Sequence, residues 1–223
     1  MASVPEPTVP DLTTMRRDYD EGSFSEATLA DTWLAQFRRW FDDAVAADLP
    51  EPNAMVLATA DPDGAPDARV VLLKGLSDEG FVFVTNGASA KGAQLALDDR
   101  VALVFPWQAL QRQVRVVGTA ARLSDADSDA LWDPRPRGAQ LAAAASVQSS
   151  VVDGREDLVR AFRELDEQTP DGKLPRPATW GAYRVVPQRV EFWQGGHDRL
   201  HDRLRFERDD EEGGGWVVRR LAP

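Results

Sequence analysis

The side chains best suited to chemistry are gathered in residues 191–206, which contain both histidines of the chain, His197 and His201. Read as a strand, with successive side chains on opposite faces, this stretch places five basic groups on one side: His197, Arg199, His201, Arg203 and Arg205. Such a row is suited to phosphate or carboxylate, because the planar guanidinium fork matches their oxygens. A solvated edge strand of mixed charge is the other interpretation, since exposed ion pairs often contribute little.

Other basic side chains occur where predicted strands end or predicted helices begin. Arg69 and Lys74 flank one strand, and Lys91 lies in the first turn of a helix, where the helix dipole favours an anion over a cation. A phosphate at that helix end would explain Lys91, and chance would explain it equally well. Neither GxGxxG nor GxxxxGKS/T follows a strand, so any phosphate is held by side chains and helix N-termini. Together with residues 191–206, these positions are consistent with two phosphorylated ligands.

The composition restricts the class of protein. The 223 residues carry a formal net charge of −11, which opposes nucleic acid or an anionic membrane as a partner. Cysteine is absent, which excludes disulfides and thiolate nucleophiles, and two histidines without HExxH spacing give no reason to expect a metal site. No apolar run reaches the roughly 20 residues that span a bilayer, and the N-terminus lacks a signal-peptide pattern. We therefore expect a cytoplasmic protein.

The elements that position these side chains are mainly strands. Residues 1–14 contain three prolines and predict a flexible arm, followed by a single domain over 15–223. Apolar spacings of three and four predict a helix over 29–45 capped by Thr28. Strands are expected at 54–60, 68–73, 80–86, 101–107, 113–123, 181–186, 189–193, 200–206 and 216–221, and further helices at 89–97 and 124–132, with Ser89 and Ser124 as caps, and at 138–146 and 153–168. Because strands and helices do not alternate, the order favours an antiparallel barrel with peripheral helices.

Several segments between position 15 and the C-terminus resemble the pyridoxine/pyridoxamine 5′-phosphate oxidase family. They are MRRDYD, LPEPNAMVLATAD, ARVVLLKG, FVFVTN with SAKG, RQVRVVG, RPRGAQL, QSS, WGAYRV, EFWQGGHDRLHDR and RLAP. The RVVLLK and EFWQG…RLHDR segments are the specific ones. The resemblance implies an antiparallel FMN-binding split β-barrel that forms a homodimer with FMN at the interface. It also implies oxidation of pyridoxamine or pyridoxine 5′-phosphate by O₂ to pyridoxal 5′-phosphate, with release of H₂O₂.

The resemblance also implies roles for individual residues. Arg69 and Lys91 would meet the FMN phosphate, whereas Lys74 and Arg135 would hold the substrate phosphate. Arg199 and His201 would be the catalytic pair that orients and polarises the substrate. The implied flavin-binding set is Arg69, Val70, Val71, Leu72, Leu73, Lys74, Val84, Thr85, Lys91, Gln113, Gln148, Ser149, Trp193 and Arg203. The implied substrate-binding set is Arg16, Arg17, Tyr19, Lys74, Arg135, Arg199, Leu200 and His201.

Three positions depart from the family pattern. Ala90 stands where many members have Arg, Leu131 where a Tyr reaches the substrate phosphate, and Ala139 where a Ser often does. We expect weaker ligand binding without loss of the chemistry, since a lost hydrogen bond costs about 0.5–1.5 kcal/mol, or about 1.5–3 kcal/mol when the acceptor is charged. His197 has no role in this scheme. Two alternatives stay open: a related flavin oxidase on another substrate, as in the phenazine pathway, and a non-catalytic flavin- or pyridoxal-phosphate-binding protein.

Overall fold

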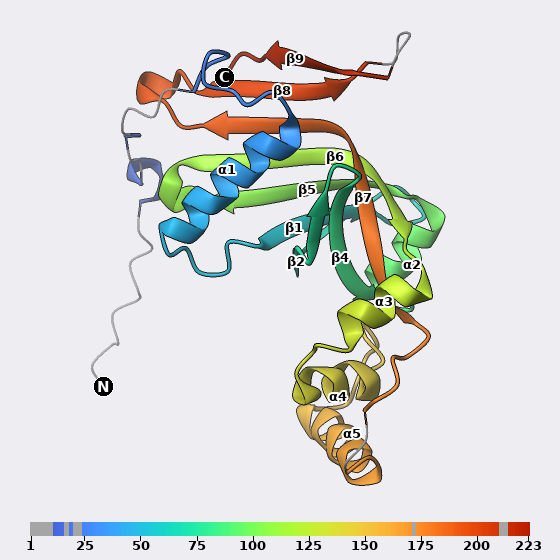
Figure 1. The fold of residues 1–223 in the computed structure, drawn as a ribbon. Helices are drawn as coiled ribbons and strands as arrows, with labels where there is room; N and C mark the ends of the chain where they lie inside the picture. The colour runs from blue at the N-terminus through green and yellow to red at the C-terminus, as the bar shows by residue number, and fades with distance from the viewer. Residues whose placement is uncertain (1–10, 16–17, 20–23, 171–172, 210–213) are drawn as a thin grey trace, which may run out of the picture.

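Nine strands form one antiparallel, curled sheet in the computed structural model, which describes residues 11–15, 18–19, 24–170, 173–209 and 214–223 (Figure 1). The strands run in the order β2-β1-β5-β6-β7-β4-β3, while β8 pairs with β7 and β9 pairs with β8. Their bounds are β1 Ala54–Ala60, β2 Pro66–Leu72, β3 Gly75–Ser77, β4 Gly80–Asn86, β5 Arg100–Trp107, β6 Arg112–Arg122, β7 Trp180–Gln194, β8 Asp202–Arg208 and β9 Trp216–Arg220. The predicted antiparallel class is confirmed. We propose that residues 15–223 form one domain, because this sheet takes its strands from most of that range.

Strand β7 is the longest and joins the two parts of the sheet. Its first half pairs with β4 and its second half with β8, so both neighbours lie on the same edge at different heights. The prediction of two separate strands, 181–186 and 189–193, is wrong. The chain stays paired with β6 through Pro187 because the register shifts between Val117 and Gly118, a β-bulge that accommodates the proline. A Cβ at Gly118 would come within 2.1 Å of the Val186 carbonyl oxygen, which explains the glycine there.

The helices and short 3₁₀ turns lie around the sheet. They are η1 Leu12–Thr14, α1 Trp33–Ala46, α2 Ala90–Leu97, η2 Gln108–Leu110, α3 Asp125–Trp132, α4 Arg137–Ala145, α5 Arg155–Gln168 and η3 His197–Arg199. The predicted start of the first helix is wrong by four residues, because Thr28 closes a turn with Ser25 and Thr32 caps α1 by accepting from the Ala35 N–H. The predicted caps Ser89 and Ser124 are confirmed. No helix in the described residues is long and apolar enough to cross a membrane.

The main core lies between α1 and the sheet, where α1 crosses the strands (Figure 1). Trp33 packs against Phe81 with ring centres 5.2 Å apart, and Phe37 packs edge-on against Phe105 at 4.9 Å. Phe37 is fully buried, so its replacement by Ala would cost about 3–5 kcal/mol. A second apolar cluster forms where α3 and α4 meet the start of β7; it consists of Trp132, Leu141, Leu174 and Trp180.

The stretch 197–206 differs from its predicted form. Residues His197–Arg199 form η3, with Asp198 and Arg199 at φ 52° and 64°, and β8 begins only at Asp202. The prediction that His197, Arg199 and His201 share one strand face with Arg203 and Arg205 is therefore wrong. The alternation holds only within β8, where Leu204 and Phe206 are buried and the two arginines face the other way.

Candidate functional site

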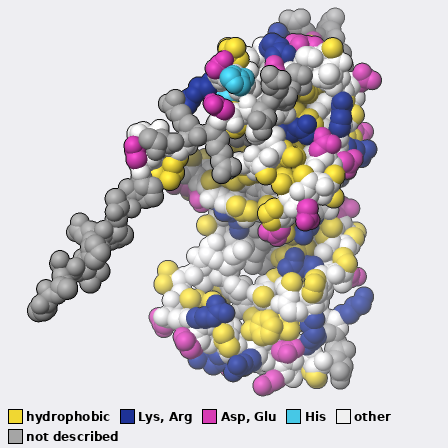
Figure 2. Space-filling view, turned by 90° about the vertical axis from the view of Figure 1, so that its left-hand side faces the viewer, with side chains coloured by type: hydrophobic (Ala, Val, Ile, Leu, Met, Phe, Trp, Pro, Cys, Tyr) yellow, Lys and Arg dark blue, Asp and Glu magenta, His cyan; other side chains and the backbone are white. Residues whose placement is uncertain are grey.

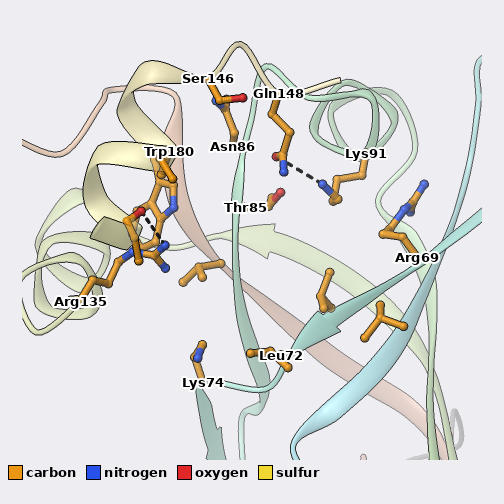
Figure 3. Close-up of a pocket in the computed structure, with 16 residues that line it drawn as sticks. Arg69, Leu72, Lys74, Thr85, Asn86, Lys91, Arg135, Ser146, Gln148 and Trp180 are labelled. Carbon is orange, nitrogen blue, oxygen red and sulfur yellow. Dashed lines mark hydrogen bonds between the residues drawn. The ribbon is translucent and has the colours of Figure 1, made fainter. Parts of the chain in front are cut away.

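A cavity of about 630 Å³ opens between β2, the end of β4, the start of α2 and the segment around α4 (Figure 3). Four cations line it, namely Arg69, Lys74, Lys91 and Arg135, and none of the described lining residues is Asp or Glu. Its remaining wall is mostly apolar, formed by Val70, Val71, Leu72, Val84, Ala139, Ala142, Ala143 and Trp180. In a chain of net charge −11, such a lining is suited to a ligand with an apolar body and negative groups.

Arg69 stands at one side of this cavity, held by a network behind it. Its guanidinium donates to Thr59 Oγ1 at 2.6 Å, to Gln94 Oε1 at 3.1 Å and to the Leu57 carbonyl at 3.3 Å, and it forms an ion pair with Asp67. Thr59 and Gln94 are themselves buried and joined by a 2.6 Å hydrogen bond. These contacts hold the charge in place, because the partners Thr59 and Gln94 are buried and Gln94 also donates to Asp67.

Lys91 lies beside Arg69 at the start of α2, and its Nζ is 3.4 Å from Gln148 Oε1 (Figure 3). Burial, followed by the nearby charge of Arg69, lowers the pKa of Lys91, while Asp67 acts in the opposite direction. A lysine with a lowered pKa next to an arginine is a position that an anion would stabilise. The N-terminus of α2 adds the positive end of its dipole at the same place.

Arg135 occupies the opposite side of the cavity (Figure 3). Its guanidinium lies 5.7 Å from the Trp132 ring centre and 5.2 Å from that of Trp180, and it donates to the Ala139 carbonyl at 3.2 Å. Burial lowers the pKa of Arg135. Its Nε is buried and has no hydrogen-bond partner among the described residues, whereas the guanidinium as a whole lines the cavity.

A second group of predicted site residues surrounds Trp193 near the end of β7. The His201 ring lies 4.8 Å and the Tyr19 ring 5.8 Å from that of Trp193, and Tyr19 is 5.6 Å from His201. One cavity here is lined by Tyr19, Gln113 and Trp193 among others, and a neighbouring one by Asp18, Tyr19, Arg199 and His201 among others. Figure 2 shows a histidine at the surface of this end of the molecule, next to acidic and basic side chains.

Arg203 is held in place on β8 beside this second group. It donates to Glu191 Oε1 at 2.8 Å and to the Ala222 carbonyl at 2.8 Å. Glu191 is only 6% exposed and also faces Arg115 at 3.5 Å, so two arginines compensate one buried carboxylate. This leaves excess positive charge on the face next to Trp193.

The two groups lie at opposite ends of β7. Trp180, its first residue, lines the first cavity, and Trp193, near its last, lines the second. At about 3.3 Å per residue, the contour of the strand from Trp180 to Trp193 is roughly 40 Å. Figure 1 shows the two ends of β7 in different parts of the sheet. One chain therefore brings together the residues within each group but does not bring the two groups together.

Several predicted residues fall outside both cavities. Arg16 and Arg17 lie outside the described residues. Leu73 is buried in the main core, Leu200 is exposed, and neither Ser149 nor Leu131 is among the residues that line these cavities; Leu131 packs against the second apolar cluster. Sequence reasoning missed Asn86, Ser146 and Trp180 in the first cavity, and the Thr59–Gln94 pair behind Arg69. The signal for the Thr59–Gln94 pair is a polar side chain at an inward-facing position of a strand, Thr59 in β1, and another in a helix, Gln94 in α2.

Comparisons with known sequences agree with this architecture. The profile of the pyridoxamine 5′-phosphate oxidase family matches residues 41–168, and that of the pyridoxine 5′-phosphate oxidase C-terminal dimerisation region matches residues 180–223. A pyridoxine/pyridoxamine 5′-phosphate oxidase of Rubrobacter xylanophilus is 50% identical over 220 residues, which is 99% of this chain and 100% of the relative. That of Salinispora arenicola is 54% identical over 200 residues, which is 89% of this chain and 90% of the relative.

A solved structure shares the fold over most of the chain. The crystal structure of PhzG from Burkholderia lata, in complex with tetrahydrophenazine-1-carboxylic acid, has a TM-score of 0.84 and 32% sequence identity, covering 91% of this chain and 98% of that one. The predicted split-barrel class is thereby confirmed, and the match to the dimerisation region supports a homodimer. By its sequence and its fold, the chain belongs to the pyridoxine/pyridoxamine 5′-phosphate oxidase family.

Proposed function

We propose that this oxidase uses FMN to convert pyridoxamine 5′-phosphate or pyridoxine 5′-phosphate to pyridoxal 5′-phosphate, with O₂ as the electron acceptor. The observation that carries this proposal is the first cavity, with two pairs of cations on opposite sides of an apolar space (Figure 3). FMN and a phosphorylated vitamer each have one phosphate and one planar ring. Such a pair requires two phosphate sites separated by an apolar region, and the cavity offers both.

The residues present fit FMN in two respects. One phosphate site is formed by Lys91, whose pKa is lowered, by the adjacent Arg69 and by the N-terminus of α2. Gln148 is a further polar contact there. Val70, Val71 and Val84 offer an apolar surface for a flavin ring. When bound, FMN supplies the chemistry, by accepting a hydride from C4′ of the substrate and passing electrons to O₂.

The substrate phosphate is assigned to Lys74 and Arg135. The rings of Trp132 and Trp180 hold the guanidinium of Arg135 at the wall of the cavity, where a phosphate oxygen would meet its N–H groups. Arg199 and His201 are assigned to the substrate ring, which they orient and polarise. Tyr19 contacts His201 and would cover the same side of the ring.

The site is completed, in this proposal, at the interface of a homodimer. Gln113 and Arg203 pair with Trp193 near the end of β7, whereas Arg69 and Lys91 line the cavity at its first residue, Trp180. A mononucleotide is far shorter than the strand between these two places. A second copy that presents its Trp193 end to the first cavity would supply the missing half. The match of residues 180–223 to a dimerisation region supports this arrangement, since Trp193 and Arg203 lie within it.

The direct test is reduction of the flavin without oxygen. Protein loaded with FMN is mixed anaerobically with pyridoxamine 5′-phosphate, pyridoxine 5′-phosphate or a reduced phenazine carboxylic acid, and flavin absorbance is followed by stopped flow. We expect bleaching by the phosphorylated vitamers and H₂O₂ formation once air is admitted. Bleaching by the phenazine compound alone would assign another substrate, and binding without any bleaching would make the chain a carrier.

The role of Arg199 is tested by R199A, with R163A on the exposed face of α5 as the matched control. We expect R199A to slow flavin reduction by at least tenfold while the protein keeps its yellow colour. A colourless R199A protein would show that Arg199 holds the flavin and not the substrate.

A further inference from the structure

The loop that carries His201 is closed by two hydrogen bonds that backbone N–H groups donate. The N–H of Gly196 donates to His201 Nδ1 at 3.1 Å, and the Leu200 N–H donates to the His197 carbonyl at 2.9 Å. A Cβ at Gly196 would lie within 2.3 Å of the Leu200 carbonyl oxygen, so only glycine allows the loop to close in this way. The sequence Gly195-Gly196 therefore has a structural requirement that is tied directly to the imidazole.

This contact determines where the imidazole carries its proton. A backbone N–H can only donate, so Nδ1 must accept and is unprotonated. In the neutral ring the proton is then on Nε2. No hydrogen bond among the described residues involves Nε2, so this N–H is the group that His201 can offer to a ligand.

The surroundings fix the direction of the ring as well. Trp193 and Tyr19 pack against it at 4.8 and 5.6 Å between ring centres. Among the described residues, the other charged or titratable groups that line the same cavity are Asp18, Tyr19, Asp198 and Arg199. The ring is thus held by one hydrogen bond and two aromatic contacts, with Nε2 as its remaining polar atom.

We propose that the Gly196 N–H is a positioning group that keeps His201 in the Nε2–H tautomer, so that His201 donates a hydrogen bond to an acceptor oxygen of the substrate. This proposal rests on the proposed function for the identity of the substrate. It has a direct chemical consequence: a neutral ring with its proton on Nε2 cannot take a substrate proton at that atom. His201 then polarises the substrate but does not act as its base.

The tautomer can be measured without turnover, because the chain has only two histidines. Protein labelled with ¹⁵N-histidine gives two sets of ring signals in long-range ¹H–¹⁵N spectra, and H197Q assigns the remaining set to His201. We expect a single tautomer for neutral His201, with Nδ1 unprotonated. His197 gives a contrast, since its Nδ1 lies 3.1 Å from the Asp198 carboxylate, which can only accept. A mixture of tautomers at His201, or a proton on Nδ1, would refute the proposal.

Variants of His201 distinguish a hydrogen-bond donor from a general base at this position. Glutamine places an amide N–H near the position of Nε2, and asparagine places one near Nδ1. We expect H201Q to reduce flavin within about tenfold of the wild-type rate, whereas H201N and H201L are slower than H201Q by at least about tenfold, as one lost hydrogen bond implies. If His201 is a base, H201Q and H201L fall together by about 10²- to 10⁴-fold, and the proposal is wrong.

The positioning role of Gly196 is tested by G196A, with G138A as the control, because a Cβ at Gly138 meets nothing within 4 Å. We expect G196A to retain FMN while the ¹⁵N signals of His201 change to a mixture of tautomers. Unchanged His201 signals in a folded G196A protein would contradict the assignment. Should G196A fail to fold, the tautomer measurement on H197Q decides the question alone. Since these spectra need no substrate, failure of the proposed reaction is distinguishable from failure of this inference.

Discussion

Lys91 extends its ammonium group to within 3.4 Å of the Gln148 side-chain oxygen and thereby links the start of α2 to the segment after α4. A neutral amide compensates only part of a lysine charge, and the nearby Arg69 is itself paired with Asp67, so the Lys91 charge has no carboxylate of its own among the described residues. The contact between Lys91 and Gln148 therefore closes one side of the first cavity, but the positive charge of Lys91 is left unbalanced. A bound phosphate would supply the missing negative charge.

Replacement of Lys91 by Met is expected to weaken FMN binding by about 10- to 150-fold, the value of one charge-assisted hydrogen bond. Fluorescence quenching of FMN during titration of the apoprotein measures the effect. K173M is the control, because Lys173 is exposed and pairs only weakly with Asp133 at 3.7 Å. Equal affinities for the two variants would remove Lys91 from the phosphate site.

The lowered pKa of Lys91 gives FMN binding a pH dependence of known sign. Phosphate binds the protonated ammonium and raises its pKa again, so affinity is highest below the pKa of the apoprotein and falls as pH rises through it. We expect the dissociation constant to increase by up to about tenfold per pH unit above that pKa. In K91M this alkaline loss should be absent; a loss identical to that of the wild type would have another source.

Complementation between two damaged chains tests the shared site. R69M/K91M damages the first cavity, and W193A damages the other end of β7. If the site forms between copies, a heterodimer of these chains has one doubly damaged site and one intact site, so flavin content should recover to about half that of the wild type. Differently tagged, co-expressed chains allow this heterodimer to be purified. If each chain builds its own site, every site carries damage and no flavin is recovered.

Replacement of Arg135 by Met is expected to raise the KM for pyridoxamine 5′-phosphate by about 10- to 150-fold with a smaller change in kcat, because the contact with the phosphate is present before and during the reaction. Steady-state oxygen uptake measures both constants. Unphosphorylated pyridoxamine is the matched control substrate, and its poor turnover should be insensitive to R135M. An equal loss with both substrates would indicate a structural role for the Arg135 stack on Trp132 and Trp180.

The contact between the Glu26 segment and β9 should contribute to stability in a pH-dependent way. Arg220 donates to Glu26 at 2.8 and 2.9 Å and lowers the pKa of that carboxyl to about 2. A depressed carboxyl pKa stabilises the fold above the unfolded value near 4.5, and this contribution is lost as pH falls toward 2. E26Q should therefore lower the melting temperature slightly at neutral pH and not at all in acid. Thermal denaturation compares it with E167Q, and a difference that persists in acid would contradict the ion-pair origin.

Local sequence signals predicted much of the fold. Strands β1 and β4 have the bounds predicted for 54–60 and 80–86, and Ser89 and Ser124 cap their helices as expected. These features depend on turn residues, alternation and capping, which act over a few positions. The errors have distant causes. β7 continues through Pro187 because a bulge in β6 accommodates it. η3, in which Asp198 and Arg199 adopt positive φ, lies in a loop that the Gly196 N–H closes by donating to His201 Nδ1.

The composition of the candidate site was predictable, but its arrangement was not. The resemblance named most residues of the first cavity, including Arg69, Lys91 and Arg135. The resemblance could not show that these residues lie far from Trp193 in the same chain. That separation arises because β7 pairs with β4 along its first half and with β8 along its second half, which depends on the whole sheet. Likewise, the period of two placed His201 on a strand face, whereas its position depends on the Gly196 N–H. Hydrogen bonds between backbone and side chain across a loop have no periodic signature.

The length of β7 has a consequence for how activity depends on the amount of protein. If the two halves of the site meet only between copies, a lone chain is inactive, and the concentration of active sites follows the square of the free-chain concentration when dimers are scarce. Specific activity would then fall on dilution below the dimer dissociation constant. FMN, which bridges the two copies in this arrangement, would shift that threshold to lower protein concentration. Binding of FMN and formation of the dimer would then be linked in a single equilibrium.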